Sequence, residues 1–223
     1  MINRLWNSLL DLVYPPRCYS CGKAGTQFCP SCLAECIPLA PNQRPQPLAA
    51  DSPLERALGI YPFQGSLRAA IHAFKYQNAY PLAQILAPLL FEFCAWQDVV
   101  LMPVPLHGVR KRERGYNQAE LLARNLAKAW HLPLSIELKR VRATEHQVGQ
   151  QAQARATNVA GAFAWHGQQP APAHILLIDD VLTTGSTFEA CASALLAAGS
   201  KAVEGLALAK AIVKPAPPLD RPE

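Results

Sequence analysis

The sequence predicts an α/β fold in which helices flank a parallel or mostly parallel sheet, with a small cysteine module at the N-terminus. Short apolar runs alternate with segments of helical periodicity in the second half of the chain, which is typical of parallel sheets. The chain has 223 residues, 50% of them apolar, so it can bury the core of one such domain plus an appendage. We expect an N-terminal unit at 1–36, a linker at 37–53, the α/β domain at 54–214 and a disordered tail at 215–223.

The first segment, Met1–Pro16, has apolar residues at helical spacing. Because Asp11 interrupts this run and no small-residue cleavage site follows, we expect a short packing helix and not a signal peptide. A helix on a membrane surface is the alternative, but its polar face would carry a single cation, Arg4. No apolar run approaches the ~18–20 residues that a membrane span needs, and we expect a cytoplasmic protein.

Five of the seven cysteines lie between positions 18 and 36. Two C-x-x-C pairs present the ligand set of a structural zinc site, formed by Cys18, Cys21, Cys29 and Cys32. So small a unit cannot bury a useful core, and bound Zn²⁺ would supply the missing stability. Two disulfides are the alternative, but they need an oxidising compartment, for which the sequence carries no signal. Cys36 is left as a free thiol or an alternative ligand, whereas Cys94 and Cys191 lie in apolar helical patterns and are expected in the core.

The linker contains five prolines and is expected to be extended. Beyond it, Ser66 is the predicted cap of a helix, and Pro88 is predicted to kink or divide a second helix. Asn117 and Glu120 have the spacing of a capping box, and Gly199 is a predicted helix stop. The predicted helices are 66–76, 81–96, 117–130 and 187–198, and the predicted strands are 99–103, 175–178 and 202–208.

A loop predicted at 179–186 joins a strand to a helix, at the sheet edge where ligands bind in parallel α/β folds. The adjacent carboxylates of Asp179 and Asp180 can accept hydrogen bonds from a sugar diol. The residues that follow can wrap a phosphate, because they offer hydroxyls, a conformationally free glycine and the first N–H groups of the helix. They are Thr183, Thr184, Gly185, Ser186 and Thr187. The segment is not a Walker A loop, because it lacks the pattern G-x-x-x-x-G-K-[ST].

The residues 175–187, ILLIDDVLTTGST, closely resemble the phosphoribosylpyrophosphate motif of type I phosphoribosyltransferases. That family's pattern is an apolar run, two acids, two variable residues, and a turn rich in Thr and Gly. The resemblance implies a type I phosphoribosyltransferase-like fold in which Asp179 and Asp180 bind and orient the ribose at a catalytic centre. It further implies that Thr183–Thr187 hold the 5′-phosphate and that Mg²⁺ bridges the pyrophosphate oxygens.

A second loop, Pro105–Tyr116, follows the strand predicted at 99–103 and is strongly basic. Its arginines Arg110, Arg112 and Arg114 can bind phosphate oxygens bidentately and form a candidate second phosphate clamp, with an ordinary exposed loop as the alternative. The segment PVPLHGVRKRERGYNQAELLA, the cysteine pairs and YPFQGSLRAAIHAFKY resemble the competence protein F (ComF) family over roughly positions 10–210. This resemblance implies a role in the uptake of transforming DNA.

The net charge of +5 is unevenly distributed. Residues 101–160 hold ten Lys or Arg and four Asp or Glu, a local charge of +6, whereas the rest of the chain carries −1. Such a segment favours a polyanionic partner, and we expect Lys139, Arg140 and Arg142 to extend it toward single-stranded DNA, with a solvated basic face as the alternative. The polar stretch 141–156 is a candidate lid, in which His146 is either an acid–base catalyst or simply solvated.

Two functions are compatible with these features. The chain is either an enzyme that displaces pyrophosphate from phosphoribosylpyrophosphate, or a binding protein for this ligand, a related phosphorylated nucleotide or single-stranded DNA. In the enzyme, positioning and electrostatics would stabilise a charged, oxocarbenium-like transition state. In the related transferases a separate hood selects the nucleophile, and the cysteine module and linker are the candidates for that place. DNA-uptake proteins are further expected partners.

Overall fold

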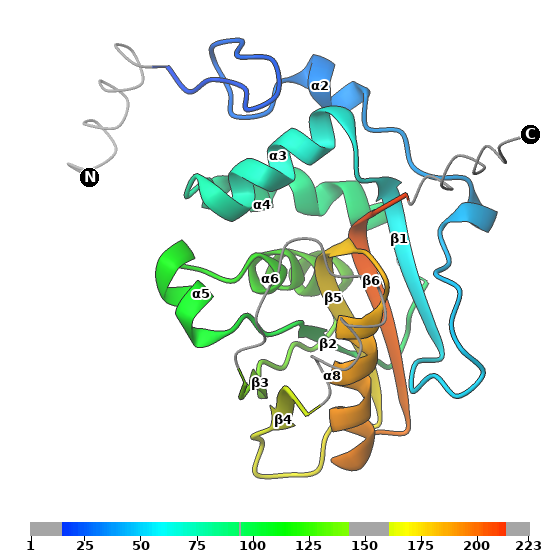
Figure 1. The fold of residues 1–223 in the computed structure, drawn as a ribbon. Coiled ribbons are helices and arrows are strands. Elements are labelled where there is room, and N and C mark those ends of the chain that lie inside the picture. The colour runs from blue at the N-terminus through cyan, green and yellow to red at the C-terminus, as the bar shows by residue number, and fades with distance from the viewer. Residues whose placement is uncertain (1–14, 94, 143–160, 213–223) are drawn as a thin grey trace, which may run out of the picture.

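A four-stranded parallel sheet forms the centre of the protein, described by a computed structural model at residues 15–93, 95–142 and 161–212 (Figure 1). The strands are β1 (Arg56–Pro62), β2 (Val100–Pro103), β5 (His174–Leu182) and β6 (Ala202–Lys210). Their order across the sheet is β1-β6-β5-β2, and every neighbouring pair is parallel. The carboxyl ends of all four strands therefore lie at one edge of the sheet.

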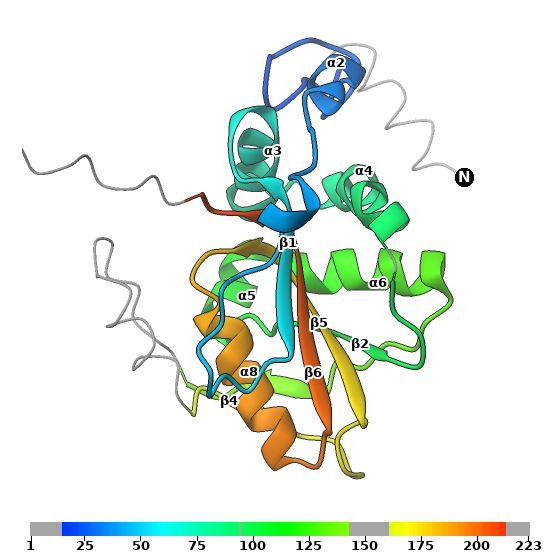
Figure 2. The same cartoon turned by 90° about the vertical axis from the view of Figure 1, so that its right-hand side faces the viewer.

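Helices cover both faces of this sheet (Figures 1 and 2). One face packs against α3 (Gly65–Tyr76), α4 (Ala83–Leu86) and α6 (Gln118–Trp130), and the other against α8 (Ser186–Ala197). Successive residues of β5 serve the two cores in turn, because side chains of a strand alternate between faces. Leu176 and Ile178 join the first core, whereas Ile175 and Leu177 join the second. The predicted parallel α/β sheet with flanking helices is thus confirmed.

Shorter elements connect these layers. Two lie before β1, namely α2 (Pro30–Ala34) and the 3₁₀ turn η1 (Pro41–Gln43). The 3₁₀ segments η2 (Tyr80–Leu82) and η3 (Ala87–Phe93) flank α4, and α5 (Gly108–Arg114) precedes α6. A separate antiparallel pair consists of β3 (Leu138–Arg140) and β4 (Phe163–Trp165).

The structure confirms several predicted helix caps, breaks and ends. Asn117 caps α6, and its side-chain oxygen accepts a hydrogen bond from the Ala119 N–H at 3.1 Å. The helical stretch predicted from position 81 is divided just before Pro88, where α4 gives way to η3. Gly199 follows the end of α8 with φ of 104°, a left-handed conformation that glycine adopts without strain.

Other sequence predictions are corrected. Ser66 is not the cap of α3 but lies inside the helix, where its hydroxyl donates to the Glu35 carboxylate. The strand predicted at 175–178 continues to Leu182, so both acids of the motif belong to β5 and the loop is shorter than expected. The basic loop folds into α5, because the His107 side chain caps its N-terminus and Gly115 ends it with φ of 77°.

Residues 37–53 run along the outer side of β1 (Figure 2). The Leu39 N–H donates to the Ile60 carbonyl at 2.8 Å, and the Gln46 N–H donates to the Ala57 carbonyl at the same distance. The segment contains the 3₁₀ turn η1 with extended stretches on either side of it, and it partly covers the edge strand. Some predictions concern positions outside the described residues. These are the N-terminal helix up to residue 14, Cys94, the candidate lid from 143 onward with His146, and the tail.

Candidate functional site

The two acids of the motif lie at the carboxyl end of the central strand β5, at the sheet edge that the sequence predicts for ligand binding. Asp180 is buried on the side of α3, where its Oδ1 lies 2.7 Å from the Nζ of Lys75. Asp179 is partly exposed and lies on the side of Arg140 and Cys191, both of which interact with its charge. Its Oδ1 also accepts a 2.8 Å hydrogen bond from the Asp180 N–H. The acid pair therefore reaches both faces of the sheet at one point.

Burial and the neighbouring charges shift the pKa values of Asp179 and Lys75. Desolvation, followed by repulsion from the Asp180 carboxylate, raises the pKa of Asp179 to about 7. For Lys75, burial acts to lower the pKa, but the carboxylate of Asp180 outweighs this effect and raises it. Lys75 is therefore a permanent cation that partly neutralises the pair.

The residues that follow the acids turn from β5 into α8. Gly185 occupies the position before the helix with φ of 89°, and a β-carbon there would lie 3.6 Å from Gln46. The hydroxyls of Thr184 and Ser186 lie 2.9 Å apart, and the Ser186 N–H approaches the Thr184 hydroxyl at 3.4 Å. The N-cap residue of α8 is Gly185, which has no side chain to cap the helix, so the long contact from Thr184 is the side-chain contact described at its first N–H. The helix start, with its N–H groups and hydroxyls, has the features of an anion-binding turn.

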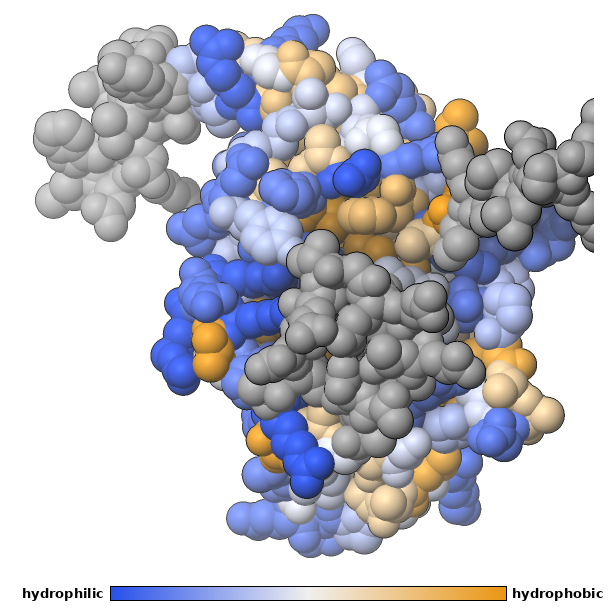
Figure 3. All heavy atoms as spheres, in the orientation of Figure 1, coloured by the Kyte–Doolittle hydropathy of each residue, from blue (hydrophilic) through white to orange (hydrophobic). Residues whose placement is uncertain are grey.

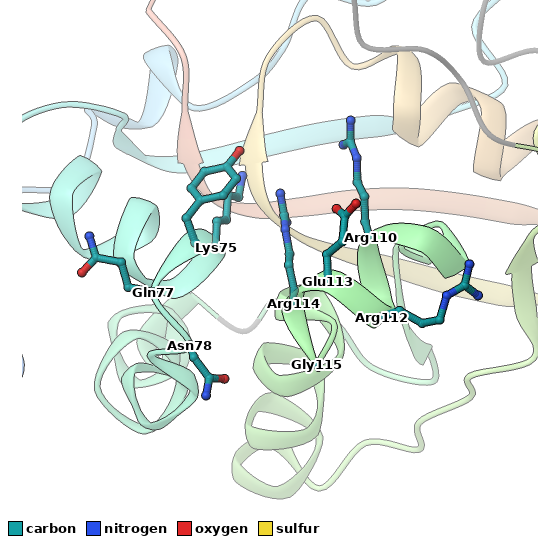
Figure 4. Close-up of a pocket in the computed structure, with 9 residues that line it drawn as sticks. Lys75, Gln77, Asn78, Arg110, Arg112, Glu113, Arg114 and Gly115 are labelled. Carbon is teal, nitrogen blue, oxygen red and sulfur yellow. The ribbon is translucent and has the colours of Figure 1, made fainter.

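A pocket of about 770 Å³ opens between the end of α3 and the helix α5 (Figure 4), and neither Asp179 nor Asp180 lines it. Lys75 and Tyr76 line it from α3, and Arg110, Arg112 and Arg114 line it from α5. In Figure 4 the side chains of Arg110 and Arg114 extend to the same side, whereas Arg112 points away from them. The guanidinium of Arg114 lies over the Tyr76 ring, 4.9 Å from its centroid.

Through Lys75 the structure connects the acid pair of β5 with the arginines of α5, whereas the turn Thr183–Thr187 does not line the arginine pocket. Its ammonium bonds to Asp180 while its side chain forms part of the wall of the arginine pocket. Arg114 is also close enough to lower the pKa of Asp179, although burial has the larger and opposite effect. Lys75 was not a candidate in the sequence, where it is simply the last cation of an amphipathic helix. Its partial burial on a helix that packs against the sheet is visible only in three dimensions.

A candidate metal centre lies at the other end of α3. The sulfur atoms of Cys18, Cys21, Cys29 and Cys32 all lie within 4.8 Å of one another. Tetrahedral zinc with four thiolates at ~2.3 Å needs sulfurs roughly 3.8 Å apart, and Cys21 and Cys29 are separated by 3.6 Å. Burial acts to raise the pKa of Cys18, but backbone N–H donors, chiefly of Cys21 and Cys29, lower it to about 6. The four cysteines are thus placed to hold a metal such as zinc.

The remaining cysteines are placed differently. Cys36 donates a hydrogen bond from its thiol to the Cys32 carbonyl at 3.5 Å and does not belong to the sulfur cluster. Burial and the neighbouring Glu35 raise the pKa of Cys36 to about 11, which keeps this thiol protonated. Cys191 lies within α8 and is fully buried, as its apolar pattern predicts.

The cysteine module is packed onto the α/β domain and is not a free appendage. Cys18, Phe28, Cys29 and Cys32 belong to the same buried cluster as Ile71 and Phe74 of α3. Figure 1 shows α2 lying directly above α3. Glu35, just after α2, accepts a hydrogen bond from Ser66 in the first turn of α3, whereas Lys75 in the last turn contacts Asp180. The cysteine module and the acid pair are thus bonded to opposite ends of one helix.

The surface around the pocket is polar. In Figure 3 hydrophilic side chains gather over α5, at the left of the view. They belong to the run Arg110, Lys111, Arg112, Glu113 and Arg114. Within the described residues, no helix combines the length and the apolar character that a membrane crossing requires.

The parallel sheet, its flanking helices, and the acid pair followed by a Thr- and Gly-rich turn at the strand ends define an α/β protein with a candidate ligand site and an added cysteine module. The chain is 34% identical over 158 residues to Competence protein F of Haemophilus influenzae, covering 65% of this chain and 68% of that protein. It is 32% identical over 204 residues to DNA utilization protein YhgH of Salmonella typhimurium, covering 84% of this chain and 87% of that protein. The chain belongs to the competence protein F family.

Two further comparisons complete these findings. No family model matches the chain. Among solved structures, it is similar to the glutamine phosphoribosylpyrophosphate amidotransferase of B. subtilis complexed with ADP and GMP, with a TM-score of 0.40 and 17% identity. The similarity covers 57% of this chain and 26% of that one.

Proposed function

We propose that this protein binds phosphoribosylpyrophosphate at the edge of the sheet where β5 ends. The observation that carries the proposal is the meeting of two segments far apart in sequence: the acid pair of β5 and the arginine pocket of α5, joined by Lys75. Asp179 and Asp180 bind the ribose hydroxyls, and Thr183–Thr187 bind the 5′-phosphate through hydroxyls and helical N–H groups. Arg110 and Arg114 bind the pyrophosphate, and Arg112 lies at the margin of the same pocket.

The ligand's charge fits this surface. Phosphoribosylpyrophosphate carries phosphate groups at both ends of its sugar, and the site offers a helix start on one side and guanidinium groups on the other. Between them, the acids accept hydrogen bonds from the ribose. When bound, Mg²⁺ would neutralise pyrophosphate oxygens, and it would enter with the ligand.

As an enzyme, the protein would exchange pyrophosphate for an acceptor at the anomeric carbon. The side chains would work by holding the ribose and the departing pyrophosphate in line, since the acids are occupied with ribose hydroxyls. A screen for pyrophosphate release with candidate bases and amines tests this. Turnover with one acceptor supports a transferase, whereas binding without turnover supports a ligand-sensing protein of the same family.

We further propose that the cysteine module binds one Zn²⁺ in a structural role. All four ligand positions would be occupied by protein, which leaves no open position for a substrate. The module packs on α3 and so stabilises the helix that carries Lys75. Its position beside the α/β domain makes it, with residues 37–53, the candidate for the hood that selects an acceptor.

The biological role that we propose is in DNA uptake, in the cytoplasm, because two relatives are named for competence and DNA utilization. A specific observation favours direct contact with single-stranded DNA as a second function. Tyr76 lines the arginine pocket and is 63% exposed, and Tyr80, 57% exposed, packs edge-on against Tyr116; bases can stack on such rings and phosphates can bind in the pocket. Lys139 and Arg142, on and just after β3, are also exposed and remain the candidates for a more distant part of this surface.

Fluorescence anisotropy with a labelled oligonucleotide separates the two ligands. Reversing the charge of Arg110 and Arg112 should weaken phosphoribosylpyrophosphate binding, whereas reversal at Lys139 and Arg142 should weaken DNA binding alone. Each phosphate contact should add about −0.7 to the slope of log affinity against log salt. No DNA binding at ~50 mM salt, where such contacts are strongest, would remove the second function.

A further inference from the structure

Within the described residues, Lys75 is a cation from outside the segment 175–187 that directly contacts an acid of that segment, Asp180. Its Nζ lies 2.7 Å from Asp180 Oδ1, and their side chains are 22% and 7% exposed. Burying such a pair costs desolvation free energy, which the attraction between the charges repays only where the geometry is good.

The last turn of α3 is fixed to the start of α6. The carbonyl of Phe74 accepts hydrogen bonds from the Tyr116 hydroxyl at 2.6 Å and from the Gln118 side-chain amide at 2.9 Å. The following residue is Lys75, and the Tyr76 ring after it is covered by the guanidinium of Arg114. Lys75 thus projects from a backbone that is held on both sides.

We propose that Lys75 is a positioning residue that fixes Asp180 and keeps the acid pair of Asp179 and Asp180 ionised for ribose binding. This inference rests on the proposed function, and it explains how the ribose-binding acids are kept ionised. Two ionised carboxylates can accept hydrogen bonds from both hydroxyls of a diol, whereas a protonated carboxyl has lost part of its accepting capacity. Adjacent buried carboxylates resist double ionisation unless a cation lies close by.

The charges around the pair support this assignment. Asp179 is influenced by Asp180 on its own strand, by Lys75 of α3, by Arg114 of α5, by Arg140 of β3 and by the Cys191 thiol of α8. Of these cations, Lys75 forms a salt bridge with the pair, through Asp180. Arg114 is engaged with Tyr76 and with the Gln118 side chain at 3.1 Å. Removing Lys75 should therefore raise the pH at which the pair becomes fully ionised.

The test compares Lys75→Met and Lys75→Arg with wild type, using an exposed control, Lys201→Met. Calorimetry with phosphoribosylpyrophosphate, ribose 5-phosphate and inorganic pyrophosphate, each with Mg²⁺, separates the two halves of the ligand. Lys75→Met should weaken the two ribose ligands about ten- to hundredfold, weaken pyrophosphate much less, and need a higher pH for half-maximal affinity. Lys75→Arg should restore most of the affinity, and Lys201→Met should behave as wild type.

Two binding results would overturn the proposal. In the first, Lys75→Met binds the ribose ligands as tightly as wild type does. In the second, Lys75→Met loses as much affinity for pyrophosphate as for the ribose ligands, which would make Lys75 part of the arginine clamp. A carboxyl titration by nuclear magnetic resonance on the ligand-free proteins gives a second, independent reading. It should show the upper titration midpoint of the acid pair moving to higher pH in Lys75→Met, and an unchanged midpoint would contradict the proposal. If wild type binds none of the three ligands, the proposed function fails while the titration still decides the role of Lys75.

Discussion

At the residue scale, the chemistry concentrates on two adjacent acids with different surroundings. Asp180 is buried and bonded to Lys75, whereas Asp179 is partly exposed on the other side of the strand. Their identity and their place after a strand can be predicted from the sequence, because an apolar run followed by acids and a Thr- and Gly-rich turn is a local pattern. Their cation cannot be predicted in this way, since Lys75 lies about a hundred positions away and meets them only through packing.

The raised pKa of Asp179 predicts a pH-dependent stability. Its folded value of about 7 lies above the ordinary ~3.9 of an unfolded chain, so the folded state binds this proton more tightly. The corresponding stability is present below pH ~4 and is lost as the pH rises toward ~7. We expect Asp179→Asn to increase the free energy of unfolding by up to about 4 kcal/mol at pH ~8.5, and by roughly half as much at pH ~5.5.

Urea unfolding at both pH values checks this prediction, with the exposed Asp51→Asn as the matched control. Equal effects of Asp179→Asn at the two pH values would show that the carboxyl titrates normally in the folded protein.

The sulfur cluster predicts one bound Zn²⁺ per chain. Cys18→Ser should lose the metal and become sensitive to protease, because the metal supplies stability that so small a unit lacks. Cys36→Ser should keep the metal, since its sulfur lies outside the cluster. Metal analysis with limited proteolysis measures both. Disulfides and no metal, found by mass spectrometry of the purified protein, would contradict the prediction.

At the element scale, the long periodic segments could be predicted and the short ones could not. The helix α6 follows a capping residue and carries a regular apolar stripe, and β5 is a continuous apolar run, so local sequence is sufficient for both. Strands β3 and β4 have three residues each and exist because they pair with each other across a long separation. The strand β1 contains Gly59 and ends at Pro62, which weakens its local signal.

Close packing of α8 on the sheet predicts that Gly205 of β6 does not tolerate a side chain. A β-carbon at this position would lie 2.6 Å from the ring of Phe188. Overpacking of this kind costs about 1–3 kcal/mol, so Gly205→Ala should lower the urea midpoint clearly. Gly108→Ala at the start of α5 is the control, because a β-carbon there would lie no closer than 3.8 Å to its neighbour, the Arg112 side chain. Similar midpoints for the two variants would show that α8 can shift away from β6.

At the scale of the whole molecule, one helix links the metal centre to the ligand site. The module packs on α3, α3 ends at Lys75 and Tyr76, and its last turn is bonded to α6. The sequence predicts a metal module, a linker and a nucleotide domain as successive units, and their limits remain predictions. What the sequence does not contain is how these units meet, because the contacts join positions that no local pattern connects.

The central claim is that the protein binds phosphoribosylpyrophosphate through Asp179–Thr187. Calorimetry with Mg²⁺ and this ligand tests it most directly, using wild type and the double variant Asp179→Ala with Asp180→Ala. Wild type should bind with micromolar-class affinity, about 8 kcal/mol, and the variant should stay folded and bind far more weakly. The absence of binding to wild type, or a folded double variant that binds as tightly as wild type, would contradict the account.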